Sequence, residues 1–255
     1  MKVSIITVTY NSEKYLKDCI DSVIIQNYPD IEHIIVDGGS TDGTVDIIKS
    51  YGNKVSQWLS EKDSGMYDAL NKGMKMATGE IIGILNSDDM LYSPNGIREI
   101  VKSFNDNQVD SVYGDLAYVE QEETRRVLRY WKGFQYKRLR FLFGWMPAHP
   151  TFYVRKEIID QLGGYETHYF SACDYEFMLR YLYKHRISSY YLPKLVVKMR
   201  EGGASNVTMA RRLRANRRDY LAMKINEIPL PLVVSVLKPL RKLPQFYSGL
   251  VQRFL

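Results

Sequence analysis

The sequence predicts an α/β protein built on a doubly wound, mostly parallel β-sheet, and two observations support this prediction. Short β-branched segments alternate with amphipathic segments of helical length through the first hundred residues, as they do when crossover helices connect parallel strands. The 255 residues are 45% apolar and 25% charged, with nine prolines, so we expect a packed globular body without long disordered segments.

The first half of the chain supplies most of the expected elements. A β-branched run opens the chain, and Asn11 or Ser12 can cap a following helix whose apolar residues recur at helical spacing. The expected strands of this half are residues 3–8, 33–36, 55–59 and 81–85. The expected helices are residues 16–24, a segment around 45–48, and 66–77.

The pattern becomes less regular from about residue 113. Strands are expected at 111–118 and 151–154, followed by a helix at 174–184 and an arginine-rich helix at 211–224. We therefore expect one domain over residues 1–205, divided into halves 1–112 and 113–205. A basic helical C-terminal extension is expected over residues 206–255.

Charge and cysteine content limit the location and the partners of the protein. The net charge is −11 over residues 1–123, +8 over 124–197 and +9 over 198–255, so the back half suits phosphates, nucleic acid or an anionic membrane face. Two distant cysteines indicate a reducing compartment. With neither a signal-peptide pattern nor a stretch of ~20 apolar residues, we expect a cytoplasmic protein.

Polar residues follow each of the four strands expected in the first half. They are Thr9 to Asn11, Asp37 to Ser40, Glu61 to Gly65, and Asn86 to Asp89. Because ligands of such sheets bind beyond the carboxyl ends of the strands, we expect these segments to converge on one site.

Asp88 and Asp89 are candidate metal ligands. Two adjacent carboxylates at the end of a buried strand repel each other unless a cation compensates their charge. A divalent cation, Mg²⁺ or Mn²⁺, would do so, and Mg²⁺ typically combines one or two carboxylates with substrate phosphates. The alternative is a solvated turn in which one aspartate caps a helix.

Four segments resemble the glycosyltransferase family 2 enzymes, which have the Rossmann-like, nucleotide-sugar-binding GT-A fold. These segments are residues 4–11 (SIITVTYN), 36–43 (VDGGSTDG), 63–73 (DSGMYDALNKG) and 85–89 (LNSDD). Residues 163–165 and 173–176 also fit, so the resemblance covers roughly residues 3–205. It implies a nucleotide-sugar-binding half, 1–112, and a smaller acceptor-side half, 113–205, in an enzyme of the type that builds bacterial polysaccharide or lipopolysaccharide in the cell envelope.

The resemblance also implies roles for individual residues in binding a UDP- or GDP-sugar donor. Thr9, Tyr10 and Asn11 would line the nucleotide pocket, and Asp37 would accept a hydrogen bond from the base, unless it only caps the next helix. The remaining donor contacts implied are Asp63, Asn71, Lys72, Asn86, Ser87 and Asp88. Lys72 also fits a solvated helix position. Most family members carry a second acidic residue where this chain has Gly38, and an aspartate where it has Asn86.

Asp174 is the catalytic base that the resemblance implies, with Glu176 as the second choice. In an inverting single displacement, a carboxylate takes the proton of the acceptor hydroxyl while that oxygen attacks the anomeric carbon opposite the leaving group. An ordinary carboxylate at a helix N-terminus is the alternative. Trp145 could stack on a sugar ring, and His149 could contact a phosphate or the metal, although both also fit structural roles.

The C-terminal extension suggests contact with a membrane and a glycan or lipid-linked acceptor. Arg211, Arg214 and Arg218 share one helical face, and apolar residues from Val233 to Phe254 recur at near-helical spacing with basic residues between them. This pattern suits a helix at the surface of an anionic bilayer. Packing on the body of the protein, or a homo-oligomer contact, is the alternative.

Other functional classes fit the sequence less well. A dinucleotide-dependent dehydrogenase needs G-x-G-x-x-G after a strand, and a nucleotide-sugar pyrophosphorylase needs a Gly-rich loop with arginine where Tyr10 and Asn11 stand. A non-catalytic nucleotide- or carbohydrate-binding protein stays open. A nucleic-acid binder that uses the basic C-terminal half is a further alternative, but residues 125–145 alternate aromatic and basic side chains only loosely, so we expect no nucleic-acid partner.

Overall fold

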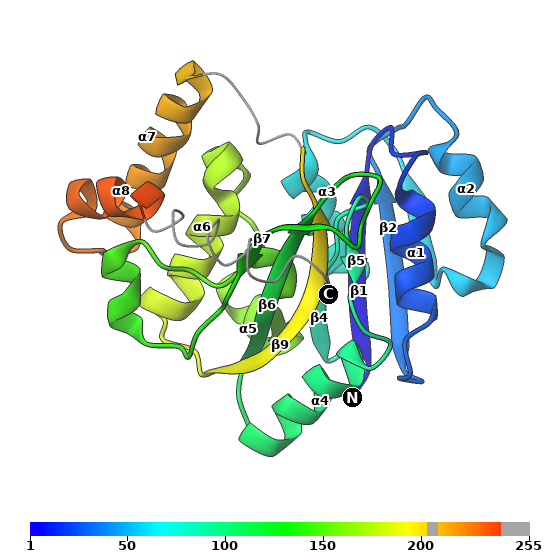
Figure 1. The fold of residues 1–255 in the computed structure, drawn as a ribbon, viewed down its shortest axis with the longest axis horizontal. Coiled ribbons are helices and arrows are strands. Elements are labelled where there is room, and N and C mark those ends of the chain that lie inside the picture. Colours follow the sequence, from blue (N-terminus) through cyan, green and yellow to red (C-terminus); the bar gives the residue numbers. More distant parts are fainter. Residues whose placement is uncertain (203–208, 241–255) are drawn as a thin grey trace.

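A computed structural model describes residues 1–202 and 209–240. Within these residues nine strands form one sheet in the order β3-β2-β1-β4-β8-β6-β9-β5, with β7 paired to β6 (Figure 1). The strands are β1 (Val3–Thr9), β2 (Ile31–Asp37), β3 (Gln57–Ser60), β4 (Ile81–Ile84), β5 (Met90–Leu91), β6 (Ser111–Val119), β7 (Val127–Trp131), β8 (Tyr153–Arg155) and β9 (Ser189–Arg200).

Helices cover both faces of this sheet. The α-helices are α1 (Leu16–Ile24), α2 (Thr44–Ser50), α3 (Met66–Met76), α4 (Gly96–Asn107), α5 (Lys156–Leu162), α6 (Cys173–Met178), α7 (Met209–Ile225) and α8 (Pro231–Leu240). The 3-10 turns are η1 (Gly52–Lys54), η2 (Arg138–Phe143), η3 (His149–Thr151) and η4 (Thr167–Ala172), and η5 (Leu179–Lys184) is π-helical. No helix in the described part of the chain has the length and apolar character needed to span a bilayer.

The expected doubly wound sheet is confirmed, and most of its strands share one direction. Strands β1 to β4 pair in parallel, and β8 runs antiparallel to both β4 and β6. Strand β9 pairs in parallel with β6, so β6 and β9 run in the same direction as β4. The carboxyl ends of β1, β2, β4, β6 and β9 therefore lie on one side of the sheet, here called the carboxyl edge.

Alternation along the central strands explains the two helical layers. In β1, Ile5 packs with Cys19 of α1, whereas the next residue, Ile6, packs with Leu70 of α3 on the opposite face. Helix α3 lies very close to the sheet: a Cβ on Gly73 would be 2.4 Å from Cγ2 of Ile6. Only glycine therefore allows α3 this approach.

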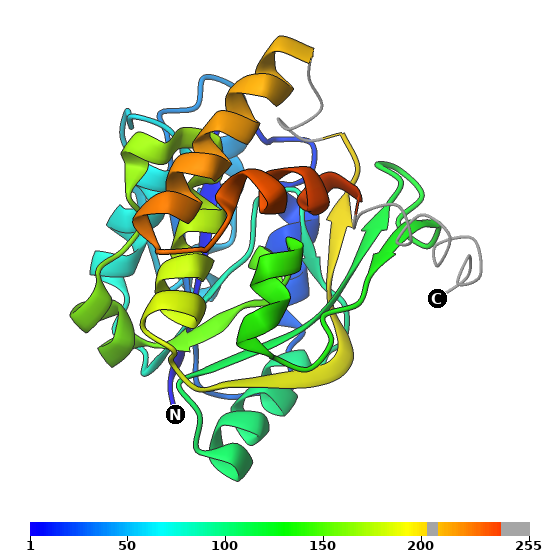
Figure 2. The ribbon, with the colours of Figure 1, turned by 90° about the vertical axis from the view of Figure 1, so that its left-hand side faces the viewer.

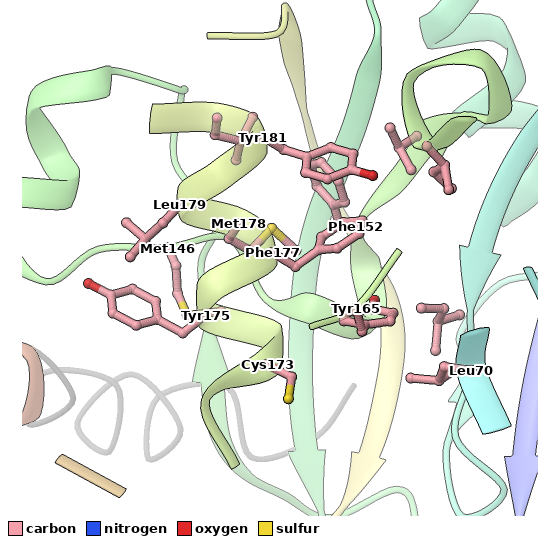
Figure 3. Packing of buried hydrophobic residues seen from close by; sticks show 14 of the residues in the cluster. Leu70, Met146, Phe152, Tyr165, Cys173, Tyr175, Phe177, Met178, Leu179 and Tyr181 are labelled. Atoms are coloured by element: carbon pink, nitrogen blue, oxygen red, sulfur yellow. The ribbon is translucent and has the colours of Figure 1, made fainter. Parts of the chain in front are cut away.

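The second half of the chain packs its own elements around α6. Figure 3 shows Tyr165 and Phe152 beside Phe177 of α6, with Leu70 of α3 across from them. The Tyr165 and Phe177 rings are stacked with centroids 4.6 Å apart. Helices α7 and α8 lie against each other next to this core (Figure 2), and bury Met223 and Val234.

Several expected boundaries differ from the structure. Helix α1 begins at Leu16 and has no side-chain cap, because the Ser12 carbonyl accepts the Tyr15 and Leu16 N–H groups in a preceding turn. The expected helix 174–184 divides into α6 and the π-helical η5. The expected division at residue 112 falls inside β6, so one continuous sheet runs through both halves.

The C-terminal extension is only partly described. Met223 and Val234 pack α7 and α8 on the body of the protein, as one of the two alternatives for this region requires. The amphipathic segment expected from Val233 to Phe254 lies beyond residue 240 for most of its length. It is therefore largely outside the described residues, as are the side chains of Arg211 and Arg214.

Candidate active site at the carboxyl edge

The carboxyl edge brings together the polar segments that follow the strands. Thr9 at the end of β1 is in register with Asp37 at the end of β2, and the Glu61 N–H donates to the Asp37 carbonyl at 3.0 Å. Leu85, which leads into Asn86, donates its N–H to the Ile6 carbonyl at 3.0 Å. The expected convergence of these segments is therefore confirmed.

Asp37 supports the loop that follows β2. Its side chain is fully buried, and its carboxylate accepts hydrogen bonds from the Gly39 and Ser40 N–H groups at 3.1 and 3.0 Å, from the Ser60 hydroxyl at 2.6 Å, and from the Ser40 hydroxyl. It does not cap α2, which begins seven residues later at Thr44. Three of these hydrogen bonds go to Oδ2 and one to Oδ1, so Oδ1 keeps acceptor capacity and the contact between Asp37 and a nucleotide base stays a prediction.

The Asp63 carboxylate lies where a side chain at position 38 would project. A Cβ on Gly38 would be 2.5 Å from Oδ2 of Asp63, while Oδ1 accepts the Gly65 N–H at 2.8 Å. Asp63 is only partly buried. The glycine that departs from the family pattern therefore leaves room for a carboxylate that arrives from a different loop.

Thr9, Tyr10 and Asn11 have different surroundings. The Thr9 side chain is 5% exposed and its hydroxyl has no hydrogen-bond partner, whereas Tyr10 is 62% exposed. Asn11 has a left-handed backbone, with φ of 49°, and its Oδ1 accepts the Thr41 N–H at 2.9 Å. These residues therefore leave one unsatisfied hydroxyl and one exposed aromatic ring near the edge.

Two of the expected donor contacts are engaged elsewhere. The Asn71 amide donates to the Tyr165 carbonyl and accepts the Tyr165 N–H, both at 2.8 Å, so it clamps a loop of the second half instead of facing a ribose. The Lys72 ammonium pairs with Glu61 at 2.7 Å and with Asp68 at 3.6 Å. Sequence spacing places both residues on α3 without showing which partner each side chain takes.

The residues after β4 form a buried acidic turn. Asn86 donates to Oδ2 of Asp89 at 2.8 Å, and the Ser87 hydroxyl lies 2.9 Å from that of Ser12. Asp89 is fully buried, its Oδ1 has no partner, and burial, with the Asp88 charge second, raises its pKa well above the usual range. Burial also raises the pKa of Asp88, which keeps partial exposure.

These two carboxylates fit a divalent cation. Within the described residues neither forms an ion pair, and no group of three or more His, Cys, Asp or Glu side chains could hold a metal by itself. An orphan carboxylate oxygen beside a second carboxylate matches the Mg²⁺ preference for one or two protein ligands completed by phosphate and water. Of the two side chains, Asp88 is partly exposed and Asp89 is fully buried.

Arg200 is a component of the edge that the sequence pattern does not reveal. It is 4% exposed, and its guanidinium donates to the Asp88 and Gln121 carbonyls, both at 2.9 Å, while pairing with Asp18. The same guanidinium lies 4.5 Å from the centroid of the Tyr15 ring. Arg200 reaches this position because β9 ends at the carboxyl edge, and β9 is not among the strands that the sequence predicts.

Asp174 lies on the other side of the edge, in a cluster of aromatic side chains. It is partly exposed in the first turn of α6, and its Oδ1 accepts the Tyr175 N–H at 2.8 Å. Burial, with a contribution from the Asp174 charge, raises the pKa of Tyr67 and Tyr165 well above the usual range. The Tyr165 hydroxyl is 2.5 Å from Nε2 of His149, whose pKa burial lowers and Asp174 partly restores.

Tyr118 links the two acidic positions. Burial raises the pKa of its phenol, Arg129 opposes this rise, and the charges of Asp89 and Asp174 both add to it. Both carboxylates therefore act on the same phenol near the end of β6. Asp89, a candidate metal ligand, and Asp174, the candidate base, are thus both within electrostatic reach of Tyr118.

Trp145 and Glu176, the other two candidates, are buried and make internal contacts. Trp145 is 1% exposed, donates its indole N–H to the Gly133 carbonyl at 2.8 Å, and packs edge-on against Phe141. Its ring is therefore unable to stack on a sugar. Glu176 is 3% exposed and pairs with Arg180 at 3.0 Å, so it supports α6 and is not positioned to serve as a base.

The fold and this edge define a GT-A glycosyltransferase, and the comparisons give its family. The model of the family "Glycosyl transferase family 2" matches residues 4–163, and the chain belongs to that family. A PGL/p-HBAD biosynthesis glycosyltransferase of Mycobacterium bovis is 30% identical over 208 residues, which cover 80% of this chain and 78% of the relative.

Solved structures confirm the GT-A fold. S. aureus TarS 1-349 in complex with UDP-GlcNAc matches with a TM-score of 0.71 and 20% identity over 97% of this chain and 73% of that chain. The mannosyltransferase PcManGT from Pyrobaculum calidifontis, in complex with GDP-Man and Mn²⁺, matches with a TM-score of 0.66 and 20% identity over 98% of this chain and 74% of that chain. At this identity the likeness concerns the fold.

Proposed function

We propose that this glycosyltransferase moves a sugar from a UDP- or GDP-sugar to an acceptor hydroxyl with inversion at the anomeric carbon. One observation carries the proposal: the turn after β4 holds the fully buried Asp89, one oxygen of which has no hydrogen-bond partner, next to the partly exposed Asp88. The nucleotide sugars bound to the two similar solved structures support the choice of donor.

Asp174 is the proposed base. Its Oδ1 is held by the Tyr175 N–H, and Oδ2 makes no hydrogen bond within the described residues. Oδ2 can therefore take the proton of an acceptor hydroxyl as that oxygen attacks the anomeric carbon. Burial lowers the pKa of His149, which favours the neutral imidazole. His149 contacts the Tyr165 hydroxyl through Nε2 and adds no positive charge near Asp174.

Asp88 and Asp89 are the proposed ligands of a divalent cation, Mg²⁺ or Mn²⁺. When bound, such a cation neutralises the charge that develops on the departing nucleoside diphosphate. Asn86 holds Oδ2 of Asp89, and Arg200 holds the Asp88 carbonyl. The protein thereby fixes the backbone and one oxygen of the acidic turn, and Oδ1 of Asp89, which has no partner, together with the Asp88 carboxylate would hold the cation.

We further propose that the protein acts on a glycan or lipid-linked acceptor at the inner face of the cell membrane. Large apolar side chains of α8 and its preceding loop are exposed, including Leu230 at 72%, Leu232 at 70% and Val236 at 63%. On η2, Leu139 and Phe143 are 68% and 60% exposed, and α8 packs against η2. The net charge of +17 over residues 124–255 favours an anionic bilayer against this face.

The test of donor and cation binding is a measurement of thermal stability. Thermal stabilisation by a panel of UDP- and GDP-sugars is measured with and without Mn²⁺ or Mg²⁺, on the wild type, Asp88→Asn and Asp89→Asn. Asp106→Asn on α4 is the matched control, because it removes an exposed carboxylate paired only on the surface with Lys102. We expect cation-dependent stabilisation by one donor, lost in both edge variants and kept in the control.

The test of the base uses Asp174→Asn. The variant should keep donor binding while turnover falls at least 100-fold, in line with the usual contribution of general base catalysis. NMR of the product gives the anomeric configuration. A retained configuration, or unchanged turnover of Asp174→Asn, contradicts the proposed mechanism.

A further inference from the structure

A second candidate site lies between η4 and α7, which pack against each other. A hollow of about 310 Å³ opens there, and its lining residues are His168, Phe170, Arg217, Arg218 and Leu221. No role in donor binding or proton transfer has been given to any of them. Its content of two guanidinium groups, an aromatic ring and an aliphatic side chain sets it apart from the acidic donor side.

The two arginines give the hollow an anion-binding character. The Arg218 guanidinium lies 4.3 Å from the centroid of the Phe170 ring and donates to the Ser171 hydroxyl at 3.3 Å, while Arg217 is exposed. Neither arginine forms an ion pair in the part of the chain that the structure describes. Adjacent guanidinium groups without a carboxylate partner are suited to a phosphate, which accepts paired N–H donors.

An apolar track continues from the hollow along α7. Leu221 and Ile225 are one helical turn apart on the same side of the helix and are 45% and 56% exposed, and Leu230 follows with 72% exposure. At the other wall, Phe170 is 60% exposed although its φ of 50° places it in the left-handed region that disfavours such residues. The surface thus changes from cationic to apolar over a few residues.

We infer that this hollow binds the phosphate of a lipid-linked acceptor, with the lipid chain running along Leu221 and Ile225. The inference rests on the proposed function and adds the chemical class of the acceptor. Ser171 precedes Asp174 by three residues, so their Cα atoms are at most about 11 Å apart. An acceptor anchored here holds the sugar that follows its phosphate on the side of the proposed base.

Binding of farnesyl phosphate to the full chain tests this inference without any donor. Isothermal calorimetry compares farnesyl phosphate, farnesol and inorganic phosphate, all below micelle-forming concentrations. We expect farnesyl phosphate to bind at least about tenfold more tightly than either of the other two, because only it contacts both parts of the surface. The Arg217→Gln/Arg218→Gln double variant should lose about tenfold or more, and Leu221→Ser should lose several-fold.

The control is Lys102→Gln on α4, which lies far from α7 in Figure 1 and should leave the affinity unchanged. Unfolding midpoints of all variants are compared, so that a loss of affinity in a well-folded variant is assigned to the hollow. Equal affinity of wild type and double variant for farnesyl phosphate overturns the inference. The inference is also overturned if inorganic phosphate binds as tightly as farnesyl phosphate, because the hollow is then an anion site that does not contact the lipid chain.

Donor binding separates this inference from the proposed function. Suppose that nucleotide sugars stabilise both the wild type and the double variant, but farnesyl phosphate does not bind. That result contradicts the acceptor site and leaves the donor proposal standing. Suppose instead that farnesyl phosphate binds in a manner that depends on Arg217 and Arg218, but no nucleotide sugar or cation stabilises the protein. That result contradicts the donor proposal and supports the acceptor site.

Discussion

Gly38→Asp is the substitution that tests most directly how the loops of the carboxyl edge share space. It restores the acidic residue common in the family at this position, but its Cβ would lie 2.5 Å from Oδ2 of Asp63. Asp63 must turn away, and two carboxylates then remain within roughly 4 Å of each other. Two like charges at that distance repel by about 4 kcal/mol at an effective dielectric constant of 20.

The measured penalty should be smaller because both side chains have access to solvent. Discounting the repulsion by about half gives roughly 2 kcal/mol in the free energy of unfolding, or about 4 to 8 °C in Tm for a chain of this size. Urea denaturation at pH 7 measures the penalty, and high salt should reduce it through screening. The matched double variant Gly38→Asp/Asp63→Ser removes the repulsion and should recover most of the stability.

The same variants report on donor recognition. If Asp63 takes the place of the missing acidic residue, Asp63→Ser should weaken nucleotide-sugar binding, and Gly38→Asp/Asp63→Ser should restore part of it. A Gly38→Asp protein as stable as the wild type, with no gain from adding Asp63→Ser, would show that the two positions do not compete for space.

Four further outcomes follow from buried groups and exposed surfaces. Burial lowers the pKa of His33 to about 4, so the unfolded state binds the proton first as pH falls below about 6.5. Unfolding free energy should fall by up to about 3 kcal/mol between pH 7 and pH 4. His33→Gln should reduce that slope, and an identical slope in the variant assigns it to other groups. Arg200→Ala should cost about 3 kcal/mol and abolish donor stabilisation, since it removes a buried guanidinium that holds the Asp88 and Gln121 carbonyls and pairs with Asp18. An unchanged urea midpoint contradicts this. Gly73→Ala should cost about 1 to 3 kcal/mol by overpacking against Ile6, with Ile6→Val as the rescue. Additive effects of the two changes argue against direct contact. Val236→Asp should release the protein from anionic vesicles in sedimentation, with Lys102→Gln as control, and equal sedimentation of variant and wild type contradicts the proposed membrane face.

The sequence was sufficient to predict the donor side of the fold because its strands are buried on both faces and its loops are short. Continuous β-branched runs such as residues 3–8 and 81–85 have few alternatives to a central parallel strand, and polar residues must then gather where those strands end. Asp88, Asp89 and Asp174 were found in this way or through the family resemblance; the structure places the first two in the turn after β4 and the third in the first turn of α6, and their roles stay predictions.

The rest depends on contacts that no local pattern encodes. Strand β9 contains Pro193 and Lys194 and has no regular alternation, so its pairing with β6 follows from tertiary packing, and Arg200 at its end could not be anticipated. Trp145 and Asn71 carry side chains suited to ligands, yet both make hydrogen bonds to backbone groups outside their own elements, Gly133 and Tyr165. Residue type alone does not distinguish a ligand contact from an internal one.

The amide clamp between Asn71 and the Tyr165 backbone has a mechanical consequence. The Asn71 amide donates one hydrogen bond to the Tyr165 backbone and accepts one from it, both at 2.8 Å, as two paired backbone strands do. These bonds join α3 of the first half to the loop that leads toward Asp174. Displacing α3 by itself would break both bonds. The clamp thus holds α3 against the loop that leads to the proposed base in the free protein, and segments other than α3 must supply whatever motion admits and releases substrates.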